Sequence, residues 1–454
     1  MAEDVVAPAP PPARADARAR RAGRRAVAAA TFGNALEFYD FTTYGFFSIQ
    51  IGRTFFPQHS EYASLMLSLG MFGAGFITRP LGGLIIGSYA DRAGRRPAMM
   101  LSFTLMGLAI LGLALIPSYA QIGVAAPILA VIARLVQGFS LGGEVGPATA
   151  YLMETARPER RGITVAWQGA SQGLAGALAA AVGFVLSNLL APSALDAYGW
   201  RIALLLGAVT LPYGLWLRRT LPETLHAPET AAAPRAGVPA GPEPSRAQLV
   251  KASRRVLVLG LLVISAGSIA SSVSSYMTTF AQHALRMDPA TAFAGGLVSA
   301  LSGVAGYLGG GWLSDRVGRR LVMVTPAVIH LLVMIPVFYW IVQARSAPAL
   351  LLGAMVNGLL AGAGASAFYA AMAESLPKRI RSGGFAAIYA LANAVFGGTT
   401  QLVVTWLVHV TGSNMAPVGY MAAAAVIGVA ARWLIVETAP AKTGALASAE
   451  PAAG

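Results

Sequence analysis

The sequence contains no cysteine, which excludes disulfide bonds and thiolate chemistry. Charged residues are scarce as well: they make up 11% of the 454 residues, against about 25% in an ordinary soluble domain. A soluble fold of this length needs more charged surface than that. The sequence also has no nucleotide-binding loop, no metal-ligand spacing and no nucleophile–base arrangement. We therefore expect no enzyme, no resident metal or cofactor, and no ATP-driven transport.

Apolar residues and glycine are abundant instead. Apolar residues make up 56% of the chain, which holds 51 glycines, and glycine is more frequent in membrane helices than in soluble ones. The net charge of +14 would be typical of nucleic-acid binding. The basic residues, however, lie in short clusters between apolar stretches, as in the cytoplasmic loops of membrane proteins. This pattern predicts a lipid bilayer, and no nucleic acid, as partner.

About twelve segments are long and apolar enough to cross a bilayer, which takes about 20 residues each. The predicted spans are 26–50, 64–90, 98–117, 122–150, 162–190, 200–218, 255–282, 291–313, 321–343, 348–373, 383–411 and 415–436. They predict an all-α membrane protein of two six-helix bundles. The predicted units are a disordered cytoplasmic arm at 1–25, bundles at 26–218 and 255–437, a flexible cytoplasmic linker at 219–254 and a cytoplasmic tail at 438–454.

The distribution of lysine and arginine predicts the orientation, because cytoplasmic loops carry the excess of both. With the N-terminus inside, nearly all basic residues outside the spans fall on the cytoplasmic side. The exceptions are Arg53, Arg201, Arg286 and Arg345. We therefore predict a multi-pass protein of the cytoplasmic (inner) membrane with both termini in the cytoplasm.

The two halves carry the same motifs at corresponding positions. The stretch GSYADRAGRR from Gly87 matches GWLSDRVGRR from Gly311 at six of ten positions, and each follows the second span of its half. A glutamate and an arginine seven positions apart follow the fourth span and recur after the tenth: Glu154 with Arg161, and Glu374 with Arg381. Parallel repeats of this kind predict a substrate site near the bilayer midplane, between the halves.

The duplicated loop resembles the signature of the major facilitator superfamily, and this resemblance implies twelve helices in two pseudo-symmetric bundles. Residues 33–57, 79–83 and 134–144 resemble the metabolite:proton symporters within that superfamily. Shorter stretches at 167–172, 199–202 and 396–399 look like its citrate and tricarballylate branch. Pro147 departs from the pattern, because many members carry glycine there, and a proline kinks a helix.

Five charged residues stand inside predicted spans: Glu37, Asp40, Arg79, Arg134 and Glu144. A charge at mid-bilayer costs about 2.5–3.5 kcal/mol on insertion scales, so each needs a partner or water. Arg134 offers the planar donor fork that suits a carboxylate. We expect Arg134 to line a water-accessible cavity, where it binds substrate or couples it to a proton site. The alternative is a buried ion pair between Arg134 and an acid of the first span.

Helical spacing places further polar residues beside these charges. Asn34 and Tyr44 share a face of the first span with Glu37, and Gln137 shares a face of the fourth with Arg134. The predicted substrate-binding residues are Arg134, Gln137, Asn34, Tyr44, Tyr276, Tyr389 and Asn393. The predicted proton carriers are Glu37, Asp40 and Glu144. Helix–helix hydrogen bonding is the alternative role for the neutral residues, and a structural role is favoured for Arg79.

The resemblance to the superfamily also implies a latch at the cytoplasmic side. There the loop aspartate caps a helix of the opposite half and pairs with basic residues when that side is shut. The implied latch residues are Asp91, Arg95, Glu154, Arg161, Asp315 and Arg319. The alternative is that the loop arginines only fix the topology.

These features together predict proton-coupled import of a small organic acid, citrate or a related tri- or dicarboxylate, by a functional monomer. Other substrates of the resembled family remain open: α-ketoglutarate, shikimate, proline or betaine. Drug efflux and a signalling role for the same fold are further alternatives.

Overall fold

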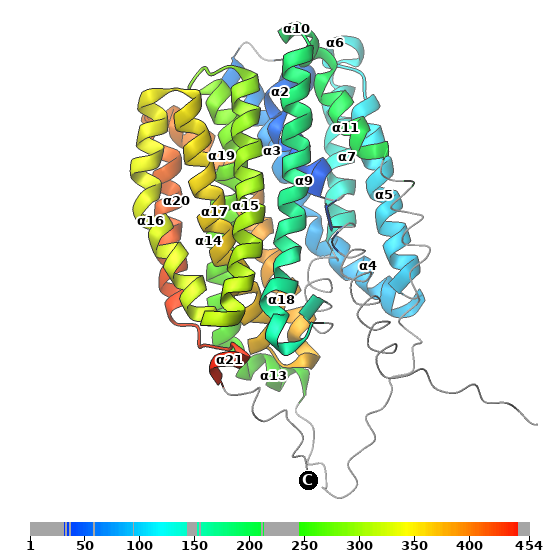
Figure 1. The fold of residues 1–454 in the computed structure, drawn as a ribbon. Coiled ribbons are helices and arrows are strands. Elements are labelled where there is room, and N and C mark those ends of the chain that lie inside the picture. Colours follow the sequence, from blue (N-terminus) through cyan, green and yellow to red (C-terminus); the bar gives the residue numbers. More distant parts are fainter. Residues whose placement is uncertain are drawn as a thin grey trace, which may run out of the picture.

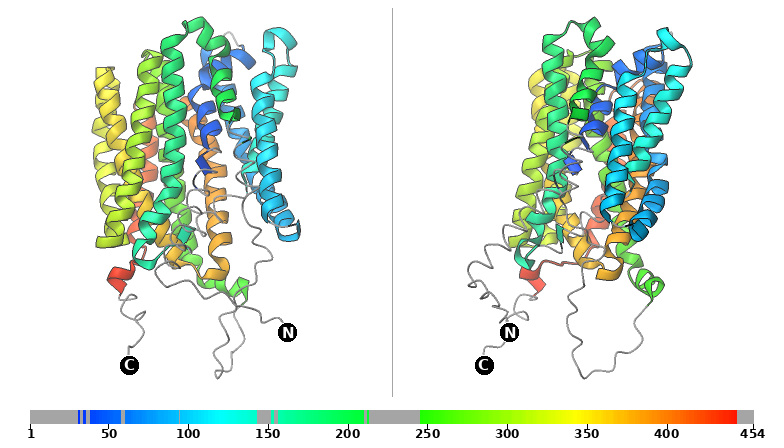
Figure 2. Two further views of the ribbon diagram at one scale, coloured as in Figure 1. Left: turned by 45° about the vertical axis from the view of Figure 1, so that its right-hand side comes forward. Right: turned by 90° about the vertical axis from the view of Figure 1, so that its right-hand side faces the viewer.

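The computed structural model is a helical bundle whose long helices run side by side (Figure 1). It describes residues 31, 34–35, 38–57, 60–93, 95–142, 152–153, 156–209, 212 and 245–443. Within these residues every regular element is a helix. Two further views show the N-terminal and C-terminal helices as two groups placed next to each other (Figure 2).

The N-terminal half contains the helices before the central linker. They are α2 (Ser48–Phe55), α3 (Glu61–Ile77), α4 (Arg79–Ala93), α5 (Arg95–Leu115), α6 (Tyr119–Ile122), α7 (Ala125–Leu141), η1 (Pro158–Arg160), α9 (Arg161–Leu189), α10 (Pro192–Ala194), η2 (Leu195–Gly199) and α11 (Trp200–Val209). The described part of the first span is helical from residue 38 onward, apart from one turn residue before α2.

The C-terminal half contains the remaining helices. They are α13 (Arg246–Ala252), α14 (Arg254–His283), α15 (Pro289–Val317), α16 (Arg319–Ala344), α17 (Ala347–Ser375), α18 (Lys378–Ala392), η3 (Asn393–Gly397), α19 (Gly398–Thr411), α20 (Ala416–Trp433) and α21 (Pro440–Thr443). Helix α13 occupies the described end of the predicted flexible linker, so that part is ordered. The predicted tail likewise contains α21.

Among the described residues, eight helical stretches are long and apolar enough to cross a membrane, and two shorter apolar helices accompany them. The eight are Glu61–Ile86, Pro158–Leu189, Arg254–His283, Pro289–Val317, Arg319–Ala344, Ala347–Ser375, Gly383–Thr411 and Ala416–Trp433; the two are Met100–Leu115 and Ala125–Leu141. Each overlaps a predicted span. The first and sixth predicted spans, 26–50 and 200–218, lie partly outside the described residues.

Two spans are interrupted at mid-length. In the second span, α3 ends at Ile77 and α4 starts at Arg79, just before Pro80, which has no N–H to continue the helical ladder. Thr78 donates its hydroxyl to the Leu135 carbonyl of α7 at 2.7 Å. In the eleventh span the π-helical turn η3 separates α18 from α19. Such single π turns occur frequently at functional sites.

The halves meet along the seam between α9 and α15, which lie side by side in Figure 1. Glycines on α9 make room for aromatic rings of α15. The Phe293 ring packs against Gly183, and the Tyr307 ring packs against Gly169. Small residues at such positions let membrane helices approach closely. The seam therefore holds the two bundles together over most of its length.

The end of the bundle that carries α13, α21 and the start of α16 is called the arginine-rich end below (Figure 1). At the opposite end the halves also touch. The Ser48 and Thr279 hydroxyls lie 3.0 Å apart, and the Tyr62 ring stacks on His409 at 3.9 Å between centroids. Arg286 bonds Glu61 at 3.1 Å. These contacts close the half interface at that end.

The start of α16, at the arginine-rich end, is capped by Glu437 from the chain after α20. Its two carboxylate oxygens accept the Arg319 and Arg320 backbone N–H groups at 2.8 and 3.0 Å. Partial burial alone would raise the pKa of this carboxyl, but backbone N–H donors from Ala439, Arg320, Arg319 and Thr438 hold it below its usual value. The cap also fits the helix dipole.

Glu437→Gln should lower the free energy of unfolding of the purified protein at neutral pH by about 0.5–2 kcal/mol, the usual effect of losing a helix N-cap. A lowered folded-state pKa gives stability that is present above the unfolded pKa and lost as pH falls through the folded value. The difference in melting temperature should therefore be largest near pH 7 and narrow below about pH 4. Glu159→Gln, at an exposed position of the same end, is the control. A difference in melting temperature between the variant and the unchanged protein that stays constant with pH would contradict a charged cap at Glu437.

Candidate functional site

A hydrogen-bonded chain of three side chains joins the first and fourth spans. Arg134 donates to the Gln137 side-chain oxygen at 2.6 Å, and Gln137 donates its amide to Asp40 at 2.9 Å. Arg134 and Gln137 lie one turn apart on α7, as the helical spacing predicted. Asp40 is 4% exposed, and its second oxygen has no hydrogen-bond partner. The glutamine thus links a guanidinium to a buried acid.

Aromatic rings of the N-terminal half enclose the Arg134 guanidinium. Its central carbon lies 4.3 Å from the Tyr44 ring centroid, 5.4 Å from Phe72 and 5.6 Å from Phe41. The residue is 1% exposed, whereas we expected it to line a water-accessible cavity. The arrangement is nearer to the alternative, a buried pairing with an acid of the first span, except that Gln137 bridges the two charges.

A second arginine, Arg79, stands at the break between α3 and α4. Its guanidinium carbon lies 4.0 Å from the Phe76 centroid and 4.9 Å from Phe41. Unlike Arg134, the Arg79 side chain is partly exposed. It lies close enough to Arg134 and to Tyr389 of the other half to interact with both electrostatically. Both guanidinium groups lie near the Phe41 ring, at 4.9 Å for Arg79 and 5.6 Å for Arg134.

The C-terminal half contributes Tyr389 and Asn393, which precede and begin the π turn η3. Both are partly exposed. Asn393 donates to the Tyr389 carbonyl at 2.9 Å and accepts the Ser268 hydroxyl at 3.1 Å. The adjacent Gly397 packs against Phe76 of the opposite half. The break in the second span and the π turn of the eleventh thus face each other across the half interface.

The other predicted substrate residues are buried and already bonded. Asn34 donates to Ser171 at 2.7 Å. The Tyr44 hydroxyl donates to the Ser68 carbonyl at 2.9 Å, and Tyr276 accepts from Thr405 at 2.8 Å. These bonds match the alternative of helix–helix hydrogen bonding. Of the seven predicted substrate residues, only Tyr389 and Asn393 are partly exposed.

Several predictions fall outside the described residues. They concern Glu37 and Glu144 as proton carriers, Glu154 in the latch, and the departure at Pro147. The backbone at Asp91 and Arg95 is helical, but their side chains are not described. Arg161 is described as the first residue of α9.

The C-terminal copy of the loop motif joins the two halves at the arginine-rich end. The Asp315 carboxylate accepts the backbone N–H groups of Gly162 and Ile163, which start α9 of the opposite half, at 2.8 and 3.0 Å. Arg319 bonds the same carboxylate at 2.6 Å and Glu374 at 3.2 Å. The aspartate therefore caps a helix across the interface, and the buried arginine holds it in place.

Asp315→Asn should open this end, because it weakens charge-assisted bonds between the halves that are worth about 1.5–3 kcal/mol each. The cysteine-free chain allows a clean readout. Val165→Cys places a thiol at a fully buried position that packs against Ala373 of the other half. We expect its labelling by a maleimide to accelerate at least about tenfold in the Asp315→Asn background. Asp288→Asn, at the opposite end of α15, is the control. Equal labelling rates would contradict the latch.

Four residues near Tyr389 or Arg319 were not among the predicted site residues: Gln172, Tyr307, Tyr369 and Glu374. Gln172 on α9 faces Tyr389, while Tyr307 and Tyr369 lie together nearby. Gln172 lies in a stretch that carried the resemblance, and Glu374 belongs to the repeated glutamate–arginine pair, so both had a signal. In the sequence, Tyr369 lies in a polar cluster of the tenth predicted span with Asn357 and Ser366, whereas no motif distinguishes Tyr307.

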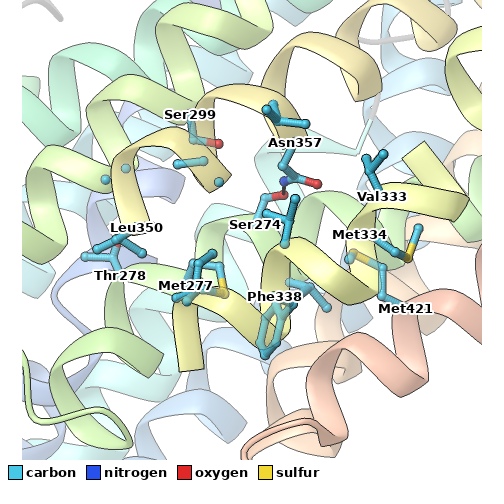
Figure 3. A pocket seen from close by; sticks show the side chains of 18 of the residues that line it. Ser274, Met277, Thr278, Ser299, Val333, Met334, Phe338, Leu350, Asn357 and Met421 are labelled. Atoms are coloured by element: carbon cyan, nitrogen blue, oxygen red, sulfur yellow. Dashed lines mark hydrogen bonds between the residues drawn. The ribbon is translucent and has the colours of Figure 1, made fainter. Parts of the chain in front are cut away.

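A separate cavity lies inside the C-terminal half, between α14, α15, α16, α17 and α20 (Figure 3). It holds about 650 Å³ of space including its mouth, and its walls are mostly apolar. Its polar part is a chain in which Asn357 donates to Ser274 at 2.5 Å and contacts His330 at 2.6 Å. None of the predicted site residues lines it.

Unpaired buried atoms show what the central region can bind. Three donor atoms have no hydrogen-bond partner in the part of the chain that the structure describes: the Nε atoms of Arg79 and Arg134 and the side-chain nitrogen of Gln172. Such groups are costly to leave unpaired, so each calls for an explanation. Two of the three carry positive charge, and all three are donors. A group that satisfies them must be a hydrogen-bond acceptor.

Comparison with known proteins identifies the family. The Major Facilitator Superfamily profile matches residues 30–342. A citrate-proton symporter of Salmonella typhi is 36% identical over 89% of this chain and 92% of its own. An alpha-ketoglutarate permease of Escherichia coli K12 is 34% identical over 83% of this chain and 86% of its own.

Solved structures show the same fold. The crystal structure of a D-xylose-proton symporter superposes with a TM-score of 0.71 and 19% identity, over 92% of this chain and 99% of that one. The predicted fold of twelve helices in two bundles is thereby confirmed. The chain belongs to the major facilitator superfamily and is a multi-pass membrane transporter rather than an enzyme.

Proposed function

We propose that the protein imports a small organic acid together with protons, and that the substrate is citrate or a related tri- or dicarboxylate. The observation that carries the proposal is a group of donor atoms at the centre that have no acceptor among the described residues: the Nε atoms of Arg79 and Arg134 and the side-chain nitrogen of Gln172. Asp40 is the one described acid beside them. A carboxylate supplies those acceptors. The similarity to a citrate-proton symporter and an alpha-ketoglutarate permease supports the same substrate class.

Asp40 is the proposed proton carrier of the described region. Its charge is held in a nearly dry place, and protonation removes that charge. Arg134, linked through Gln137, stabilises the ionised form. A substrate anion bound near Arg134 offsets its positive charge at Asp40 and so favours proton uptake. Glu37 and Glu144 stay predicted carriers at positions outside the described residues.

The orientation follows from the positive-inside rule. The arginine-rich end faces the cytoplasm, both termini lie there, and the protein works as a monomer in the cytoplasmic membrane. Asp315 then belongs to the cytoplasmic gate. Asp91, Arg95, Glu154 and Arg161 form the proposed second half of that gate.

The test is uptake into proteoliposomes that contain the purified full chain. Labelled citrate, α-ketoglutarate, shikimate and proline are offered separately, with and without an imposed pH gradient. Accumulation of citrate that follows the gradient and collapses with a protonophore supports the proposal. Citrate uptake that ignores the gradient contradicts proton coupling, and preferential uptake of proline contradicts the anionic substrate class.

A further inference from the structure

We propose that Arg79, with Tyr389 and Gln172, forms the subsite that holds a substrate carboxylate, and that Arg134 acts through Asp40 instead of on the substrate. This inference rests on the proposed organic-acid transport and adds the residue that contacts the anion. It reverses the roles that the sequence indicated, since Arg79 was favoured as structural and Arg134 as the binding residue.

The first argument is accessibility. Arg134 is 1% exposed and is enclosed by Tyr44, Phe72 and Phe41. One of its terminal nitrogens is occupied by Gln137 at 2.6 Å. A ligand reaches it only after these rings move. Arg79 is partly exposed and donates no hydrogen bond to any side chain in the described part of the chain. Arg79 is therefore the more exposed residue of the two arginines.

The second argument is orientation. Phe76 and Phe41 hold the guanidinium carbon at 4.0 and 4.9 Å from their centroids. Cation–π contacts fix the plane of an arginine but leave its in-plane N–H groups free. Those N–H groups form the fork that matches a carboxylate in two parallel hydrogen bonds. Arg79 is thus held in position by ring faces, and the described residues offer no side-chain acceptor to its N–H groups.

The third argument is the backbone around the subsite. Arg79 stands at the break between α3 and α4, and Tyr389 comes one turn before the π turn η3. In transporters, interrupted helices mark the substrate site, because irregular backbone is tolerated where it lines a cavity. The two interruptions meet through Phe76, which packs on Gly397 and Gly398 of the opposite half.

The fourth argument is the set of neutral donors. Tyr389 lies within electrostatic reach of Arg79 and next to the side-chain amide of Gln172. A carboxylate on Arg79 therefore meets a hydroxyl and an amide as well. These two donors come from opposite halves, on α18 and α9. An anion bound there bridges the halves, as alternating access requires of a substrate.

The experiment measures citrate binding and citrate uptake in the same purified variants. Binding is followed as the shift in melting temperature with increasing citrate, which reports affinity without transport. Arg79→Gln should weaken binding and raise the KM of uptake about 10- to 100-fold, since charge-assisted hydrogen bonds are lost. Arg79→Lys keeps the charge but not the fork, so it should restore part of the affinity.

The matched control is Arg201→Gln. Arg201 stacks on Trp200 at 4.2 Å, as Arg79 stacks on Phe76, but it bonds backbone carbonyls at the opposite end of the bundle from α13 and α21. Its loss should leave citrate affinity unchanged. Tyr389→Phe tests the same subsite with a smaller change and should weaken binding by about 3- to 10-fold. It keeps the test decisive if Arg79→Gln does not fold.

The outcomes separate this inference from the function on which it rests. If the unchanged protein neither binds nor imports any organic acid, the proposed function fails. If it imports citrate, and Arg79→Gln and Tyr389→Phe bind citrate normally while Arg134→Gln does not, the function stands and the subsite is wrong. Weakened binding in both subsite variants, with pH-driven accumulation still present at saturating citrate, supports the inference.

Discussion

Asp40→Asn is expected to abolish the accumulation of citrate driven by a pH gradient while exchange of internal for external citrate continues. Asparagine still accepts the Gln137 amide, which bonds Asp40 at 2.9 Å, so the chain to Arg134 keeps its shape. What disappears is the group that takes up the proton. One pH unit supplies about 1.4 kcal/mol per proton, or about tenfold accumulation for one coupled proton. Asp40→Asn should therefore lose this tenfold accumulation of citrate.

The measurement is citrate accumulation in proteoliposomes with an imposed gradient of one pH unit, alongside counterflow at equal pH. Asp288→Asn serves as the control, because Asp288 only caps α15 at the other end of the bundle and asparagine is also a good cap. If Asp40→Asn accumulates citrate like the unchanged protein, the proton resides elsewhere, and Glu37 and Glu144 become the carriers to test.

The fold was predictable because its signals are local. Apolar length gives the spans, and the duplicated loop with its glutamate–arginine pair gives the two halves. The loop motif also carried a correct contact: Asp315 caps a helix of the opposite half with Arg319 beside it. A motif of this kind is readable because its charges lie close in sequence to the helix ends that they stabilise.

The site was predictable only in part, because accessibility depends on tertiary packing. The spacing on α7 placed Arg134 and Gln137 on one face, as the structure has them. The alternative prediction, a buried pairing of Arg134 with an acid of the first span, did not say which acid; in the structure Asp40 takes that place through Gln137. It could not indicate that Tyr44 and Phe72 close over Arg134, since they belong to other helices. The partial exposure of Arg79 likewise depends on the helix break at Pro80 and on the π turn opposite. The sequence shows the proline but not what it faces.

The contact between the second and fourth spans brings the two arginines together, and Gly138 permits it. A Cβ at this position would overlap the Gly75 carbonyl and approach the Thr78 hydroxyl to 2.7 Å. Thr78 in turn bonds α7 at Leu135. The obstacle is backbone, which cannot rotate away, so α7 must move from α3 to accept a methyl group.

Gly138→Ala is therefore expected to destabilise the protein by about 1–3 kcal/mol, the usual cost of overpacking. It should also lower citrate uptake, because α7 carries Arg134 away from the ring of Phe41 that it shares with Arg79. The measurements are the melting temperature in detergent and the initial uptake rate.

Gly112→Ala is the matched control, since Gly112 lies in the last turn of α5, as Gly138 does in α7, but has nothing within 4 Å of its added Cβ. Alanine favours a helix by about 1 kcal/mol over glycine, so this control should be neutral or stabilising. The same propensity gain acts at Gly138, and only the clash opposes it. The difference between the two variants therefore measures the α3–α7 contact alone. Equal melting temperatures would mean that the two helices do not pack as closely in the membrane as the structure has them, and the shared surface of the two arginines would lose its basis.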